Sequence, residues 1–403
     1  MVTRGEKMLA LRRSRMAAAP AFLRGGFRPF FFSGAAWAVI ALALWLTTLA
    51  GAIVLPSAFD PLAWHRHEML FGFVGAIIAG FLLTAIPNWT GRLPIAGPPL
   101  AGLLGLWLAA RAAVFFSGTI GLPAAAVLDV GFYFVLAGVA AREVIAAGNR
   151  NIPVVGLVGL FGIANAIDHL AMAGLVDPGL GWRSATTLII VMISLIGGRI
   201  VPSFTRNWLA KKGVKHRLPG QPGRFDIFVV AATAVAMIVW TVLPQAVVAG
   251  VLLIAAALLQ AVRMSRWGGL RAARDPFVFV LHMGYAWVPI GLALLGGSLL
   301  VVAIPPSAAI HALTAGAMAT MILAVMTRST LGHTGRELKA DAPTVLIYLL
   351  VTAGAVLRVT SPLGLVDYTA GMEVAAIFWG GAFVLFLGVY GPMLFAPRAD
   401  GKL

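Results

Sequence analysis

The sequence predicts an all-α polytopic membrane protein with twelve transmembrane helices. Two observations indicate this class: the composition and the length of the apolar runs. Of the 403 residues, 60% are hydrophobic and 11% are charged, and the mean hydropathy is +0.95. Soluble domains are far less apolar. The chain has no cysteine, which excludes disulfides, iron–sulfur clusters, thiolate haem ligation and thiol catalysis. Any metal must therefore be bound by His, Met, carboxylate or backbone groups.

Each apolar run is long enough to cross a bilayer as a helix. The runs lie at residues 31–54, 63–86, 98–117, 122–146, 151–175, 184–209, 225–243, 245–264, 276–300, 306–328, 342–360 and 372–396. Residues 1–30 are predicted to form a basic cytoplasmic tail, 31–397 one transmembrane domain, and 398–403 a second cytoplasmic tail. The first run is too long for the apolar part of a cleavable signal peptide, so we expect none.

The basic residues are distributed very unevenly between the two sides of the predicted membrane domain. The net charge is +16, but 25 of the 30 Lys and Arg residues fall in the two tails and in alternate connections. The opposite connections hold only Arg66, Arg183 and Arg358. This bias places both termini in the cytoplasm. The charge therefore indicates contact with anionic membrane lipid and no nucleic-acid partner.

Three of the runs that cross from outside to inside end in similar sequences. These ends are IPNWTGR (86–92), VPSFTRN (201–207) and LGHTGR (331–336). Aligning their threonines gives offsets of 115 and 129 residues, and the combined offset of 244 also matches His67 to His311. We expect three four-helix repeats, at about 31–146, 151–264 and 276–396, around a pseudo-threefold axis with a shared site. The alternative is coincidence, because Pro and Gly are common at helix ends.

The histidines supply the candidate metal ligands. His65 and His67 open the second run at its outer end, and positions i and i+2 of a helix point about 200° apart. These two imidazoles should therefore reach two neighbouring centres. His311 and His169 also lie at outer ends, so four outer imidazoles could supply two axial haem ligands and further ligands for copper. Two inner histidines are additional metal candidates: His282 and His333. The alternative is histidines wetted by lipid headgroups.

Charged residues in the outer half of the membrane are the other site candidates. Arg66, Arg183 and Arg358, with Arg111 inside the third run, could clamp haem propionates as bidentate donors. The alternative for each is an interfacial arginine that reaches the headgroups. The acidic candidates are Glu68, Asp129 and Asp168. Intramembrane carboxylates are costly, so these three are predicted to carry protons to a metal site, or else to form salt bridges with the arginines.

Five motifs extend over most of the chain: WHRHEMLFGF (64–73), GFLLTAIPNWTG (80–91), GRIVPSFTRN (198–207), HALTAG (311–316) and MTRSTLGHTG (326–335). Together they resemble the motifs of the NnrS family over nearly the whole sequence. This resemblance implies a bacterial inner-membrane protein with haem, of b type, and copper, which takes part in denitrification and in resistance to nitric oxide. The predicted array is also distantly similar to haem–copper oxidases, although the sixth run carries no histidine.

The expected function is reduction of nitric oxide to nitrous oxide at an outer haem–metal centre, with Glu68, Asp168 or Asp129 relaying protons. Nitric oxide is then the small-molecule ligand, and the electron donor is a quinol or a small redox protein. The first alternative is a non-enzymatic haem sensor or sink for nitric oxide, which needs the same ligands but no proton path. The second is a transporter, which twelve spans and internal repeats also suit.

Overall fold

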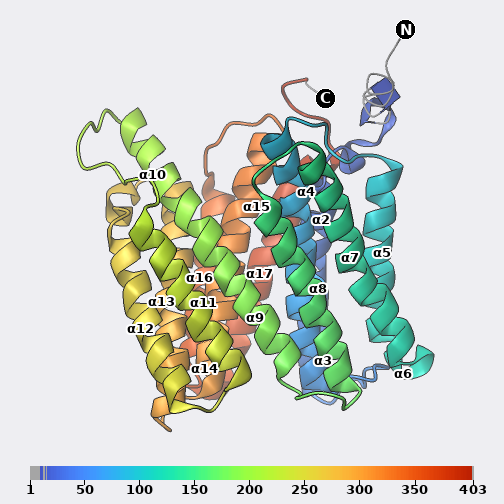
Figure 1. Cartoon of the computed structure of the whole chain (residues 1–403), viewed down its shortest axis with the longest axis vertical. Coiled ribbons are helices and arrows are strands. Elements are labelled where there is room, and N and C mark those ends of the chain that lie inside the picture. The colour runs from blue at the N-terminus through green and yellow to red at the C-terminus, as the bar shows by residue number, and fades with distance from the viewer. Residues whose placement is uncertain (1–9, 12–13, 15, 402–403) are drawn as a thin grey trace. The chain divides into compact units, whose positions relative to one another are not determined.

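A computed structural model describes residues 10–11, 14 and 16–401 of the chain. All regular structure in these residues is helical (Figure 1), with no β-strand. Twelve of the described helices are long and apolar enough to cross a membrane. The predicted all-α, twelve-span class is therefore confirmed. Parts of the two predicted tails, at 1–9, 12–13, 15 and 402–403, lie outside the described residues.

Three of the twelve spans are long helices made of consecutive segments, and the other nine are single helices. The long ones are α3–η2–α4 (Pro61–Thr90), α9–η3–α10 (Leu180–Lys211) and α14–η5–α15 (Pro306–His333). The others are α2 (Phe27–Leu49), α5 (Pro98–Phe115), α7 (Leu122–Ala146), α8 (Ile152–Met172), α11 (Arg224–Val242), α12 (Val247–Ser265), α13 (Pro276–Leu300), α16 (Ala342–Thr360) and α17 (Tyr368–Phe395). Short helices are η1 (Ala21–Leu23), α6 (Ser117–Ile120) and η4 (Gly269–Ala272).

Local sequence signals explain most helix ends. Asp60 accepts a hydrogen bond from the backbone N–H of Ala63 at 2.9 Å and is followed by Pro61, so the second span starts with a capped first turn. That span ends where Gly91 takes the left-handed conformation (φ 67°), which glycine adopts without steric cost. All twelve described spans begin and end within about five residues of the predicted bounds.

The first span starts earlier than its hydropathy indicates, at Phe27 instead of residue 31. Arg28 lies in its first turn and is buried. Its guanidinium donates to the carbonyl oxygens of Leu394 (2.8 Å) and Ala396 (2.7 Å) at the end of α17. A helix carboxyl end carries partial negative charge, so it stabilises this arginine. The apolar run alone could not reveal that partner.

The chain divides into two compact units. Unit 1 comprises the described residues up to Ala185, Ser329–Leu338 and the described part of Leu387–Leu403; unit 2 comprises Thr186–Arg328 and Lys339–Phe386. Within unit 1, α7 packs against α5, α8 and α4 (Figure 1). Within unit 2, α13 packs against α12 and η5. The predicted arrangement in three repeats stays a prediction.

Each of the three long helices contains a π-helical segment. These segments are η2 (Glu68–Val74), η3 (Ile193–Gly197) and η5 (Ala312–Met318). A π segment inserts extra backbone into the helix, loosens the usual hydrogen-bond ladder and is frequent at functional sites. η2 begins directly after His67 and η5 directly after His311. Hydropathy carries no signal for these π segments.

Candidate metal centre

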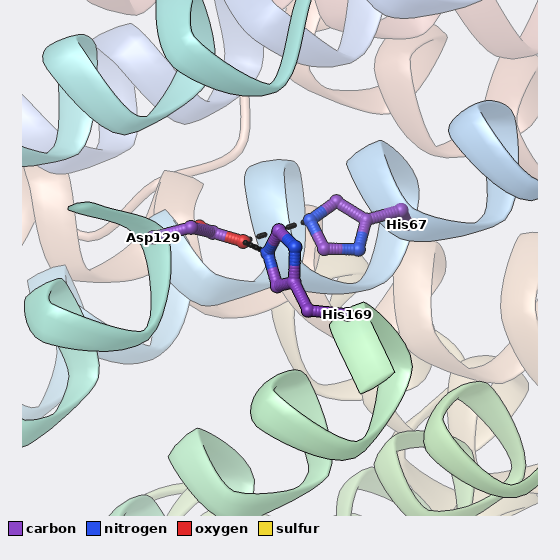
Figure 2. A group of neighbouring side chains, drawn as sticks. All are labelled: His67, Asp129 and His169. Atoms are coloured by element: carbon purple, nitrogen blue, oxygen red, sulfur yellow. Dashed lines mark hydrogen bonds and ion pairs between the residues drawn. The ribbon is translucent and has the colours of Figure 1, made fainter. Parts of the chain in front are cut away.

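Three buried side chains from three helices of unit 1 converge on one point. His67 ends α3, Asp129 lies on α7 and His169 lies near the end of α8. Figure 2 shows both imidazoles directed at the Asp129 carboxylate. One ligand atom of each residue lies within 4.8 Å of the others, and all three residues are buried. Two nitrogen donors and one oxygen donor at this spacing form a candidate metal site.

Asp129 is the centre of the cluster. Its Oδ2 is 2.8 Å from His67 Nε2, 3.0 Å from His169 Nε2 and 2.8 Å from the amide Nδ2 of Asn165. Its other oxygen, Oδ1, accepts a hydrogen bond from Arg111. One carboxylate thus has four polar partners from three other helices. These bonds hold the two imidazoles at a fixed spacing.

The cluster extends to two more carboxylates. Asp168 Oδ2 is 2.8 Å from His67 Nδ1, so the imidazole of His67 lies between two carboxylates. Glu68 Oε2 accepts hydrogen bonds from Arg111 Nη1 at 2.7 Å and from Trp37 Nε1 at 2.6 Å. Each of these carboxylates is at most 4% exposed, which removes the stabilisation that water would give to their charges.

Negative charge exceeds fixed positive charge around Asp129. Three carboxylates are balanced by the buried guanidinium of Arg111 and, more distantly, by Arg66, which attracts Asp168 electrostatically. Glu68 Oε1 and Asn165 Oδ1 are buried acceptor oxygens without a hydrogen-bond donor among the described residues. An additional cation would offset the excess charge: either a metal ion at the three ligand atoms or a second proton on His67, whose two ring nitrogens both face carboxylate oxygens. The donor set therefore fits a metal ion.

Neighbouring aromatic residues hold the π segment that follows His67. The Tyr133 hydroxyl donates to the carbonyl oxygen of Phe71, and Trp107 Nε1 donates to that of Gly72 at 3.1 Å. A Cβ added at Gly72 would clash with Glu68 and Trp37, so the close packing requires glycine there. Carbonyls released by the π segment are thus satisfied by α5 and α7, the helices that also carry Arg111 and Asp129.

His65 does not join His67. Its ring stacks on Trp45 of α2, with centroids 4.8 Å apart and planes 18° apart. The two imidazoles therefore have different neighbours, and the prediction that they serve two neighbouring centres stays a prediction. His169 is held with its ring 5.1 Å from that of His67 and 5.4 Å from that of Phe59.

The predicted arginines of unit 1 have protein partners. Arg111 forms ion pairs with Glu68 and Asp129, as in the predicted alternative of salt bridges between carboxylates and arginines. Arg66 lies over the Trp182 ring, 5.2 Å from its centroid. Arg183 pairs with Asp177 at 2.6 Å. A backbone hydrogen bond from Gly179 and this guanidinium lower the pKa of Asp177.

Three of the other predicted residues belong to unit 2. His311 Nδ1 is 2.8 Å from the carbonyl oxygen of Ser307, so Nδ1 donates and Nε2 keeps its lone pair. Arg358 interacts with His311 electrostatically. His282 Nε2 donates to the hydroxyl oxygen of Thr205 at 2.8 Å, because that hydroxyl itself donates to Val201. His333, in unit 1, contacts the Phe27 ring at 5.4 Å.

Four residues of the centre are not among the predicted site residues: Trp37, Trp107, Tyr133 and Asn165. Three of them lie one helical turn from a residue that was identified. Trp107 precedes Arg111, Asn165 precedes His169, and Tyr133 follows Asp129, each by four positions. Residues four apart share a helix face, so this spacing was a usable signal. Trp37 gave none.

Single substitutions of His65 and His67 should have different effects on the bound metal. We expect His67→Ala to lower bound metal at least tenfold, because it removes a donor nitrogen held by two carboxylates. We expect His65→Ala to keep the metal of this centre, because its ring stacks on Trp45. Metal analysis of the purified proteins, at equal helix content by circular dichroism, measures both. Equal loss in the two variants would contradict this site.

Comparison with known proteins shows the family of this chain. No curated protein matches it. The model of one protein family, described as NnrS protein, matches residues 21–398, which is nearly the whole sequence and includes every residue of the candidate centre. The twelve apolar helices further indicate a multi-pass membrane protein. The chain therefore belongs to the NnrS family.

Proposed function

We propose that this protein binds nitric oxide at a metal centre built on His67, Asp129 and His169 and reduces it to nitrous oxide. The observation that carries the proposal is the buried group of two imidazoles and one carboxylate from three helices. Such a donor set suits iron(II) or copper(II) and leaves coordination positions open for a small molecule. Family membership supports the link to nitric oxide.

The cofactors in this proposal are haem b and copper. A bound metal ion at this centre would supply a site for the gas and accept electrons for its reduction. His311 would hold the iron of a haem through Nε2, because its Nδ1 donates to the Ser307 carbonyl and this leaves the Nε2 lone pair free. Arg358, with a buried Nη1 that lacks a hydrogen-bond partner in the described structure, suits a propionate there.

The protein's own residues would hold and move the protons. Reducing two nitric oxide molecules to nitrous oxide and water consumes two protons and two electrons. Asp168 Oδ2 is 2.8 Å from His67 Nδ1, the ring nitrogen that stays free when Nε2 binds a metal, so Asp168 could hold a proton beside the centre. Glu68 is linked to Asp129 through Arg111 and is the second carboxylate that could hold one. A hydrogen-bonded chain of titratable groups can pass protons inward. A quinol or a small redox protein would supply the electrons.

The proposal includes three repeats, distantly like haem–copper oxidases, in a bacterial inner membrane with both termini cytoplasmic. The π segments support a correspondence between two of these repeats. η2 and η5 have seven residues each and are related by the same 244-residue offset that matches His67 to His311. The offset also matches Gly91 to Gly335, both in the left-handed conformation. Gly91 and Gly335 belong to the Thr-Gly-Arg ends that define the offset, whereas the two π segments lie outside those ends and match independently.

A single-turnover assay tests the reductase proposal. Purified protein that is loaded with metal, reduced and mixed with excess nitric oxide should yield about one nitrous oxide for every two electrons stored. Gas chromatography measures the product. The His67→Ala protein is the matched control and should remain at background. Absence of nitrous oxide from fully metal-loaded, reduced wild type would reject the enzymatic function.

One observation favours the alternative of a non-enzymatic sensor or sink. Arg111 binds both Glu68 and Asp129, and charged groups in such a network can be purely structural. Glu68→Gln and Asp168→Asn therefore separate the two functions. If both variants bind nitric oxide normally but produce no nitrous oxide, the carboxylates act in proton delivery. If neither they nor the wild type produce it, the protein is a sink.

A further inference from the structure

A small cavity lies in unit 1 at the opposite end of the long helix that carries His67. It has a volume of about 90 Å³, is open on one side, and is lined by α2, α4 and α15. Its lining residues are Phe31, Phe81, Thr84, Ala85, Asn88, Ser329 and His333. Asn88 follows His67 by 21 positions in one continuous helix, which corresponds to roughly 30 Å. The cavity is therefore separate from the candidate metal centre.

Three polar groups of the lining are available to a ligand. In the described part of the chain, the side chains of Asn88 and Ser329 and the ring nitrogens of His333 make no hydrogen bond with other protein groups. Thr84 differs, because its hydroxyl donates to Gly80 at 2.7 Å and accepts from the Phe27 N–H at 3.1 Å. An amide, a hydroxyl and an imidazole together offer both donors and acceptors.

The remaining lining is apolar and largely aromatic. Phe31 and Phe81 contribute two rings, and Ala85 leaves space between helices. No charged side chain is among the described lining residues. Arg328, the residue before Ser329, instead lies over the Phe204 ring at 4.2 Å. Neutral donors beside aromatic faces suit an uncharged ring that carries oxygen atoms, and are poorly matched to a phosphate.

We propose that this cavity binds the head ring of a quinone or quinol. The ring would insert between Phe31 and Phe81, with its oxygen atoms bonded to His333 on one helix and Asn88 on another. A closed cavity that accepts benzene holds about 150 Å³, and this one holds about 90 Å³, so only the edge of the ring would enter it and the rest would lie outside its mouth. If the proposed function holds, this cavity would bind the electron donor, which would then be a quinol. Binding of the ring to the cavity does not itself depend on the proposed function.

Binding of decylubiquinone to the full-length protein in phosphatidylcholine nanodiscs tests the proposal, with empty nanodiscs as the reference. Ala85→Phe fills the cavity and should weaken binding more than tenfold. Asn88→Leu and His333→Leu each remove one hydrogen-bonding group and should weaken binding about tenfold. Gly332→Ala is the control beside His333, since an added Cβ there comes no closer than 3.8 Å to another group, and it should keep the wild-type affinity.

Unchanged affinity in the Ala85→Phe protein, with wild-type helix content, would overturn the proposal. It would also be overturned if phosphatidylglycerol nanodiscs protect the His333 imidazole from chemical labelling while decylubiquinone does not. Asp129→Asn should lose metal yet bind decylubiquinone normally, because its site is at the other end of the helix. Failure of the metal centre and failure of this cavity can therefore be told apart in the same set of proteins.

Discussion

We expect Asp129→Asn to reduce bound metal at least tenfold while leaving the helices formed. The substitution keeps the size of the side chain but removes the charge that both imidazoles, Asn165 and Arg111 share. A neutral amide is a weak metal ligand, and its NH₂ group also presents hydrogens where Asp129 presents an oxygen. Elemental analysis of the purified protein, with circular dichroism for helix content, gives the result.

Asp177→Asn provides the control for this prediction. It is the same chemical change at a carboxylate that is also paired with an arginine, at 2.6 Å, but is 59% exposed. An exposed pair contributes about 0–1 kcal/mol, so metal content and stability should stay close to wild type. If Asp129→Asn binds as much metal as Asp177→Asn, then Asp129 is no ligand, and the cluster is a structural ion-pair network.

The sequence was sufficient for the number and bounds of the helices because these depend on local signals. Long apolar runs, proline in a first turn and glycine after a last turn act within a few residues. Asp60 and Pro61 thus start the second span, and Gly91 ends it. Arg28 falls in the predicted tail, because a charged residue there has no local reason to enter a helix. Its acceptors, the carbonyls of Leu394 and Ala396, lie more than 360 positions away in the chain.

The site was partly predictable for a related reason. Titratable residues inside apolar runs are costly, so His67, Asp129, His169, Asp168 and Glu68 could be identified individually. Which of them meet depends on how α3, α7 and α8 pack, and hydropathy carries no information on that packing. The π segment after His67 was equally hidden, because its carbonyl oxygens accept hydrogen bonds from Tyr133 and Trp107 on other helices.

We expect Arg111→Met to be the most destabilising single substitution among those considered. Methionine is close in size but leaves two buried carboxylates, Glu68 and Asp129, without their shared guanidinium. Removing one partner of a buried ion pair costs about 3–5 kcal/mol, because the remaining charge stays away from water. Unfolding in a mixed-micelle detergent titration measures the free-energy change.

Arg92→Met is the matched control, since Arg92 also pairs with a buried carboxylate, Glu143, at 2.6 Å. Arg92 itself is 36% exposed, and Arg142 remains as a second partner 3.0 Å from Glu143. We expect a loss of less than about 1 kcal/mol there. Adding Glu68→Gln to Arg111→Met should recover part of the lost stability, because it removes one of the two unpaired charges. If the double variant is no more stable than Arg111→Met, packing of the arginine, and not charge balance, is what stabilises the centre.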